Sequence, residues 1–303
     1  MLWRRRPNVR RLARRGKSRR LVSALTYRDF VTDRFGRVYD LGASTRRDAA
    51  LALGSAPDTD EVDAGSALIE SLRDPSAEVR RAAAKALGAR RETRAARALA
   101  DAGLSWRDPR DQQAGSAAVE ALFHLSGPEA ARALVGTVIE RGADTKRARD
   151  ILSRIVADGR ADTAQSAAST AVLALLHGDD GAAERAAEVL VWLGPAGVEP
   201  LLGVVESGNG ARLASIRALG RLRDLRSTET LVAFLSHDEP DVRRATAIAL
   251  GEIADPRVTR PLLAATSDSD YGVRKAALEA VQALGVAASL PEFESPAGAS
   301  GLD

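Results

Sequence analysis

A ten-residue frame that recurs along the chain is the feature that most constrains its fold. In the copy VRRAAAKALG, from Val79 to Gly88, apolar residues follow the i, i+3, i+4, i+7, i+8 spacing of a single helical face. Clear copies are TRRDAALALG (45–54), ARLASIRALG (211–220), VRRATAIALG (242–251) and VRKAALEAVQ (273–282), and poorer ones are AGSAAVEALF (114–123), ARDILSRIVA (148–157) and RAAEVLVWLG (185–194). Most copies end 31 to 35 residues apart, and a period of that length predicts a repeat array.

A second helical stretch separates successive copies, for example at 62–73, 129–141, 198–207, 227–236 and 258–266. Each repeat is therefore expected to be a hairpin of two helices that needs its neighbours to bury its apolar face. Asp–Pro pairs at 74–75, 108–109 and 255–256 predict helix starts, with the aspartate as N-cap and the proline in the first turn. The glycines that close several frames are expected to cap helix ends.

The stretches DPSAEVRRAAAKALG (74–88) and EPDVRRATAIALGEIADPRV (239–258) resemble HEAT repeats, in particular the short, alanine-rich variety first described in phycobilisome lyases. This resemblance implies an all-α fold, a right-handed α-solenoid of about eight HEAT-like helical hairpins. A solenoid is a way of presenting surface, so the fold does not by itself identify a function.

We expect four segments along the chain. Residues 1–26 form a basic N-terminal arm or degenerate capping helices, 27–41 an aromatic-rich insertion, 42–285 the HEAT-like solenoid, and 286–303 a disordered acidic tail. The net charge of +3 hides an asymmetry, because residues 1–26 hold ten basic residues and no acidic one, which leaves 34 basic against 41 acidic residues in the remainder. An acidic body is not typical of a nucleic-acid groove.

The first 26 residues allow two interpretations. Their apolar positions indicate two short helices that cap the first repeat, with an outer face loaded with arginine. The alternative is an arm that binds phosphate or anionic lipid. The candidate anion-binding residues are Arg4, Arg5, Arg6, Arg10, Arg11, Arg14, Arg15, Arg19 and Arg20. We favour the cap.

The stretch 27–41 breaks the helical pattern. Residues 30–32 and 37–39 are expected to be short strands around a turn at 33–36, which predicts a β-hairpin. It concentrates four aromatic residues, Tyr27, Phe30, Phe35 and Tyr39. These side chains are candidates for anchoring a partner. We favour the alternative that the hairpin folds back over the exposed core of the first repeat.

A column of arginines occupies the second position of most frames: Arg46, Arg80, Arg149, Arg212, Arg243 and Arg274. Carboxylates stand five or six residues earlier, at Asp40, Asp74, Asp144, Glu206, Asp238 and Asp268. Each carboxylate is expected to pair with an arginine, within its repeat or across to the next. HEAT families are known for such a ladder, and the planar guanidinium suits bidentate pairing with a carboxylate. We favour this structural ladder over a basic stripe for phosphates.

Nothing in the sequence predicts catalysis. The chain has no cysteine, and its three histidines, His124, His177 and His237, are scattered and lack the His–Glu pairs that hold iron in deoxyhypusine hydroxylase. Trp106 and Trp192 are too isolated to support a DNA-glycosylase-like site, and nothing marks a bilin-lyase chromophore site. We therefore predict a non-enzyme without cofactor or metal. The absence of cysteine and of an apolar run of about 20 residues favours a cytoplasmic protein without a transmembrane segment.

The predicted function is a scaffold or adaptor that binds one or more partner proteins along its repeats. In HEAT arrays the second helix of each hairpin lines the concave side, so the resemblance implies partner contacts at Arg81, Lys85, Arg217, Arg244, Lys275 and Glu279. One alternative is a nucleic-acid or anionic-surface adaptor that uses the arginine-rich N-terminus. Another is a bilin-lyase-like or DNA-glycosylase-like HEAT enzyme.

Overall fold

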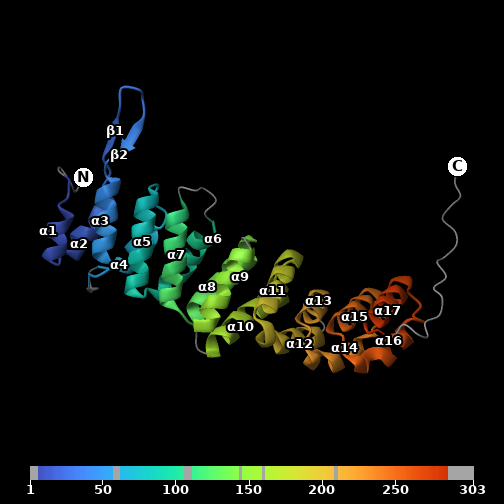
Figure 1. Ribbon diagram of the computed structural model, residues 1–303. Helices are drawn as coiled ribbons and strands as arrows, with labels where there is room; N and C mark the ends of the chain where they lie inside the picture. Colours follow the sequence, from blue (N-terminus) through green and yellow to red (C-terminus); the bar gives the residue numbers. More distant parts are fainter. Residues whose placement is uncertain are drawn as a thin grey trace, which may run out of the picture. The chain divides into compact units, whose positions relative to one another are not determined.

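The computed structural model describes residues 6–56, 62–105, 111–142, 145–158, 161–207 and 211–285. These residues contain seventeen α-helices and one two-stranded antiparallel sheet (Figure 1). The chain divides into two compact units, Met1–Ala174 and Leu175–Asp303, and each is described by itself.

The first unit begins with α1 (Val9–Arg14) and α2 (Ser18–Ala24), followed by β1 (Phe30–Thr32) and β2 (Val38–Asp40). Its repeat helices are α3 (Ala43–Leu53), α4 (Ala64–Ser71), α5 (Ala77–Arg90), α6 (Ala96–Ser105), α7 (Gln112–Leu125), α8 (Pro128–Arg141) and α9 (Thr145–Asp158). The next helix, α10 (Ala161–His177), crosses the boundary and lengthens the interval between the fourth and fifth frames. The second unit holds α11 (Asp180–Trp192), α12 (Val198–Ser207), α13 (Arg212–Leu222), α14 (Thr228–Phe234), α15 (Pro240–Ile253), α16 (Thr259–Ala265) and α17 (Tyr271–Ala283).

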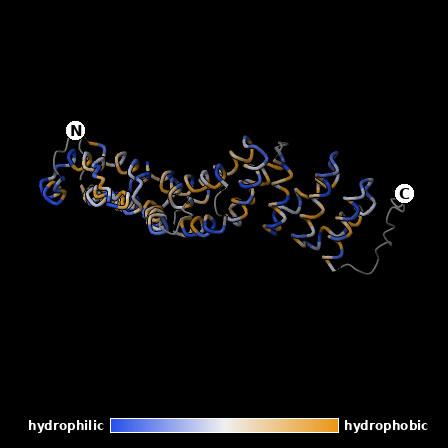
Figure 2. The backbone as a smooth tube through the Cα atoms, turned by 90° about the horizontal axis from the view of Figure 1, so that it is seen from above, coloured by the Kyte–Doolittle hydropathy of each residue, from blue (hydrophilic) through white to orange (hydrophobic). Residues whose placement is uncertain are grey.

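The eight frames coincide with the odd-numbered helices from α3 to α17. Within the first unit α3, α5 and α7 pack in a row, and within the second unit α11, α13, α15 and α17 do the same. The even-numbered helices form the other layer of each unit. Hydrophobic and hydrophilic residues alternate along the helices, as amphipathic packing requires (Figure 2). The prediction of an all-α solenoid built from helical hairpins is confirmed.

The glycine that closes a frame lies inside its helix, not at the end, so the capping prediction was wrong for α5, α13 and α15. A Cβ on Gly251 would stand 2.8 Å from the Cβ of Ala280, and one on Gly88 would stand 2.9 Å from the Cα of Ala121. Each glycine therefore lets its helix approach the next helix of the row closely. The helices continue past it and end at residues with positive φ, namely Arg91, Arg223 and Ala254.

The two Asp–Pro pairs in the described residues begin their helices differently. Asp255 caps the short 3-10 turn Pro256–Val258 by accepting the backbone N–H of Arg257, as expected. Asp74 does not cap α5, whose N-cap residue is Ser76. The pair at 108–109 lies outside the described residues.

The N-terminal helices α1 and α2 pack on α3 and bury Val9, Leu12 and Leu21. They therefore cover the first repeat. The inserted hairpin is present, with β2 one residue later than expected, and pairs Phe30 with Asp40 and Thr32 with Val38. It extends beyond the N-terminal end of α3 instead of folding back, so the favoured interpretation of the hairpin as a cover for the core was wrong (Figure 1).

Candidate functional site: the arginine ladder, the inserted hairpin and a groove

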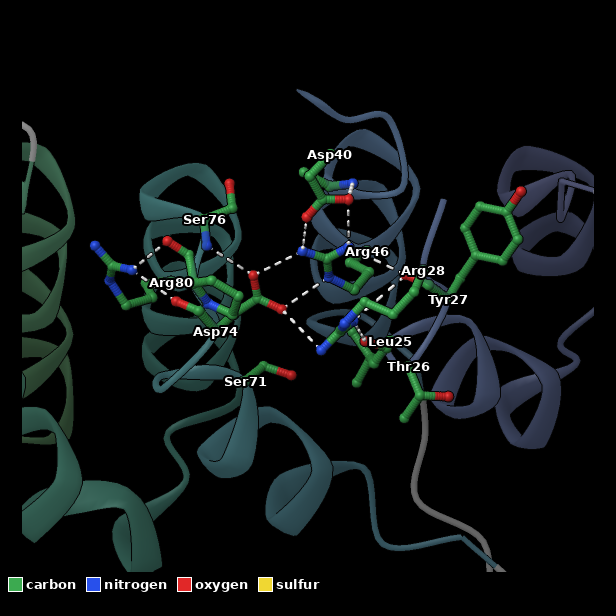
Figure 3. Close-up of polar contacts among 12 residues, drawn as sticks. Leu25, Thr26, Tyr27, Arg28, Asp40, Arg46, Ser71, Asp74, Ser76 and Arg80 are labelled. Atoms are coloured by element: carbon green, nitrogen blue, oxygen red, sulfur yellow. Dashed lines mark hydrogen bonds and ion pairs between the residues drawn. The ribbon is translucent and has the colours of Figure 1, made fainter. Parts of the chain in front are cut away.

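The ladder begins at Arg46, whose side chain is fully buried between three segments of the first unit. Its Nε and Nη2 donate to the carboxylate of Asp74 at 2.8 and 2.9 Å, and Nη1 and Nη2 donate to Asp40 at 3.1 and 2.6 Å (Figure 3). Nη1 also donates to the carbonyl oxygen of Tyr27 at 3.1 Å. One guanidinium therefore ties both ends of the inserted hairpin to the first turn of α3 and to the next repeat.

The guanidinium of Arg46 and the carboxylates of Asp40 and Asp74 stabilise each other's charged forms. Burial opposes the charged form of Arg46, but its hydrogen bonds to Asp74 and Asp40 outweigh burial and raise its pKa above the ordinary value. In turn the hydrogen bonds from Arg46 lower the pKa of Asp40. The cluster is a buried ion network in which each carboxylate oxygen has a donor, the condition under which such charges are tolerated.

The same arrangement recurs at Arg80 and Arg243. Nη1 of Arg243 donates to the carbonyl oxygens of His237 and Asp238, in the turn before its own helix, while Nε and Nη2 donate to Asp268 of the next repeat, each at 2.8 Å. Nη1 of Arg80 donates to the carbonyl oxygens of Asp74 and Pro75, and Nη2 to the carboxylate of Asp111. Each arginine thus holds its own turn through backbone oxygens and reaches forward to a carboxylate of the next repeat.

Three members of the column depart from this pattern. Arg274 donates to the carbonyl oxygens of Asp268 and Ser269, and no repeat follows it within the described residues. Arg149 is exposed, and its expected partner Asp144 lies outside the described residues. The remaining one, Arg212, does not pair with Glu206 as expected, because its Nη1 lies 3.0 Å from Nε2 of His237 and its Nε donates to the carbonyl oxygen of Val205.

The hairpin is held at its base and ordered at its tip. The backbone N–H of Leu41 donates to the carbonyl oxygen of Asp29 at 2.8 Å. At the tip the carboxylate of Asp33 accepts the backbone N–H groups of Arg37 and Phe35 at 2.9 and 2.8 Å, and these bonds lower the pKa of Asp33. Phe30, Phe35 and Tyr39 are exposed, whereas Tyr27 is half-buried and its hydroxyl donates a hydrogen bond to the carboxylate of Asp29.

The candidate anion-binding residues are presented on α1 and α2. Exposed side chains with no ion pair to any described carboxylate are Arg10, Arg11, Arg14, Arg15, Arg19 and Arg20. Arg6 is also exposed, but its guanidinium is engaged, because its Nε donates to Thr45 at 3.0 Å and its Nη2 to Ser44 at 2.6 Å. Arg4 and Arg5 lie outside the described residues.

The candidate partner-binding residues of the solenoid are not gathered into one site. Two of them, Arg217 and Arg244, line a groove of about 500 Å³ formed by residues of α11, α13 and α15, within the second unit. The others lie elsewhere: Nη1 of Arg81 donates to Gln113, Lys85 is exposed on α5, and Lys275 pairs with Glu279 at 3.9 Å.

The apolar part of the groove comes from Leu213 and Ile248, and Ile248 is 46% exposed. Arg244 pairs with Asp241 at its rim, 2.9 Å apart. Arg217, in contrast, has no carboxylate partner among the described residues, since its Nε donates to the carbonyl oxygen of Leu213. The groove therefore combines an apolar centre with an available cation.

The profile of HEAT repeats matches residues 40–123 and 209–285, together more than half of the 303 residues. The chain belongs to the HEAT-repeat family. Both matched ranges include arginines that reach a carboxylate of the next repeat, so the ladder lies within the recognisable part of this HEAT-repeat protein.

Several solved structures resemble the HEAT-repeat protein at low identity. Human deoxyhypusine hydroxylase is 19% identical with a TM-score of 0.36 over 92% of this chain and 100% of that one. The complex of CpcE and CpcF of phycocyanin lyase from Nostoc sp. PCC7120 is 19% identical with a TM-score of 0.30, over 91% and 87%. A designed armadillo repeat protein is 16% identical with a TM-score of 0.32, over 72% and 98%. With TM-scores below 0.5, these likenesses carry no argument about function. No curated protein is significantly similar in sequence.

In the described part of the HEAT-repeat protein, no group of three or more His, Asp or Glu side chains could hold a metal ion. Likewise, no helix within the described ranges combines the length and apolarity needed to cross a bilayer.

Two features of the structure were not predicted from the sequence. One is the groove, because its apolar centre depends on Ile248, which stands at a position of α15 that faces away from the core. The other is His237, which stands 25 residues after Arg212, as Asp268 stands 25 residues after Arg243. Comparing these offsets would have found it.

Proposed function

We propose that this HEAT-repeat protein is a non-catalytic adaptor that binds a partner protein at the groove formed by α11, α13 and α15. The observation that carries the proposal is the exposed Ile248 beside Arg217 in an open groove of about 500 Å³. An apolar anchor next to a cation is the composition of an interaction hot spot, because the apolar group gains from burial while the charge selects its partner. A cytoplasmic location stays a prediction.

The alternating charges around the groove support a protein partner over a uniform polyanion. Arg244 and Asp241 pair at the rim, and Glu184 and Glu252 also line the groove. These carboxylates would repel the phosphates of a nucleic acid. A protein segment with an apolar side chain and a carboxylate would fill the centre and pair with Arg217.

The test is affinity capture with full-length protein, followed by direct binding of the captured partner in purified form. Ile248→Asp and Arg217→Glu should each weaken binding by at least about tenfold, because each removes a central contact. Leu225→Asp and Arg260→Glu are matched controls, since Leu225 is 56% exposed and Arg260 is exposed, and both stand outside the groove. Equal binding by all four variants and the wild type would contradict the proposal.

A second candidate function is attachment to an anionic surface through residues 1–26. The observation in its favour is the set of exposed cations on α1 and α2 that have no carboxylate partner among the described residues. Binding to anionic ligands should then fall with salt and require these residues. Salt-insensitive binding, or binding that survives replacement of the arginines by glutamine, would remove this candidate.

A further inference from the structure

Exposed apolar side chains are concentrated on the inserted hairpin. Of the twelve large apolar residues that are exposed in the described ranges, six lie between residues 30 and 41: Phe30, Val31, Phe35, Val38, Tyr39 and Leu41. Phe35, at the tip, is 66% exposed. A concentration of this kind marks a surface that meets an apolar partner.

The hairpin is apolar on both faces. Residues paired across an antiparallel ladder point to the same side, so Phe30 and Val38 share one face of the hairpin, and Val31 and Tyr39 share the other. A hairpin that lies flat on a protein surface buries one face and leaves the other in water. Apolar side chains on both faces instead suit a medium that surrounds the element.

Cations stand at the tip and beside the base of this hairpin. The guanidinium groups of Arg34 and Arg37 lie 4.8 and 5.3 Å from the ring centre of Phe35. At the base, α2 leads into the hairpin through Tyr27, whose carbonyl oxygen is held by the buried Arg46. The exposed arginines of α1 and α2 are therefore attached to the same end of the first unit.

We propose that this end of the molecule binds the surface of a bilayer rich in anionic lipid, with the hairpin inserted among the lipids and the arginines at the headgroups. This inference rests on the second candidate function and identifies its surface. Apolar groups and cations together supply the two signals that stable membrane attachment requires, since neither a short apolar element nor a basic patch suffices alone. At the apolar tip Arg34 can extend its guanidinium group to the phosphates, whereas Nε of Arg37 donates to Asp33 at 3.1 Å.

A nucleic acid fits these observations less well. Phosphate contacts would use the arginines, and Phe35 could stack on a base, but the exposed aliphatic side chains of Val31, Val38 and Leu41 would remain in water. A bilayer uses all of these groups.

The experiment is flotation of the full-length protein with vesicles of phosphatidylcholine alone or mixed with phosphatidylglycerol. The wild type should float only with the mixed vesicles, and less at high salt. Phe35→Ser combined with Val38→Ser should reduce partitioning by about tenfold or more, since two apolar side chains leave the lipid. Arg14→Gln and Arg15→Gln should each reduce it roughly fivefold. Leu225→Ser and Arg260→Gln, at exposed positions of the second unit, should leave it unchanged.

The possible results distinguish failure of the lipid assignment from failure of the anionic-surface function on which it rests. Failure of the wild type to float with mixed vesicles overturns it. If the arginine variants lose binding to both vesicles and duplex DNA while the hairpin variants lose neither, the anionic-surface function stands and the lipid assignment fails. Ile248→Asp should float normally, so loss of the protein partner is scored independently. Circular dichroism melts that match the wild type confirm that the hairpin variants are folded.

Discussion

Nη1 of Arg212 lies 3.0 Å from Nε2 of His237, at the place in the ladder where Arg243 meets Asp268. The backbone N–H of Glu239 donates to Nδ1 of His237 at 3.1 Å, just as the backbone N–H of Asp270 donates to Asp268. His237 therefore occupies an aspartate's position. It faces two donors, whereas a neutral imidazole offers only one acceptor nitrogen.

Restoring an aspartate at this position should strengthen the second unit. In His237→Asp a carboxylate would accept both the Arg212 guanidinium and the Glu239 N–H, and the gain in the free energy of unfolding is expected to be about 1 kcal/mol. Urea unfolding followed by circular dichroism measures it. His177→Asp, at an exposed position, is the control and should give no gain. A destabilised His237→Asp would show that stacking of the imidazole on Phe234, 5.9 Å between ring centres, matters more than the missing acceptor.

The periodicity of the sequence was sufficient to predict the helices because each frame is amphipathic by itself. It also placed an arginine and an aspartate near each turn. It did not reveal that an arginine donates to the backbone of its own turn and to the carboxylate of the next repeat, because sequence spacing does not measure distances between repeats. Asp111 was missed as the partner of Arg80 for that reason.

The hairpin shows a different limit of prediction from sequence. Its strands and turn follow from local sequence, and these were predicted to within one residue. Whether the hairpin covers the core or extends from it depends on what else covers the first repeat. Helices α1 and α2 already do so, and Arg46 fixes the base of the hairpin through Tyr27 and Asp40. The closing glycines were misassigned for a similar reason, since a close approach to the next helix is a tertiary requirement.

Replacing Arg46 should destabilise the first unit strongly. In Arg46→Met the carboxylates of Asp40 and Asp74 would lose their buried counter-charge, and the expected loss is about 3 kcal/mol or more. Arg46→Lys should recover only part of it, because an ammonium cannot reach both carboxylates and Tyr27 in this geometry. Arg47→Lys, at a partly exposed position, is the control. Urea unfolding of the three variants and the wild type measures these differences. Equal free energies of unfolding would mean that Arg46 is not the centre of this network.

Adding a methyl group at the close contact between α15 and α17 should also be costly. A Cβ on Gly251 would meet Ala280 at 2.8 Å, so Gly251→Ala should force the helices apart and lower the free energy of unfolding by about 1 to 3 kcal/mol. Gly203→Ala is the matched control, because Gly203 is exposed within α12 and a Cβ there meets nothing within 4 Å. That substitution should stabilise the helix by about 0.5 to 1 kcal/mol. Opposite signs in thermal melts are expected, and a stabilised Gly251→Ala would contradict the close packing.

Acid should unfold the second unit in a range set by its paired aspartates. Hydrogen bonds from the side chain of Arg257 and from its backbone N–H lower the pKa of Asp255 to about 2, and Arg243 lowers the pKa of Asp268. The pKa of an aspartate in the unfolded state is about 3.9, so the native state binds these protons less readily than the unfolded state. Their contribution to stability is therefore complete above about pH 4 and is lost as the pH falls toward about 2.

Asp255→Asn removes one such carboxylate, so it should be less stable than the wild type at neutral pH, and the difference should shrink on acidification. Urea unfolding at a series of pH values measures this, with Asp150→Asn, at an exposed position of α9, as the control. A difference that stays constant down to about pH 2 would mean that the ion pair with Arg257 does not stabilise the fold.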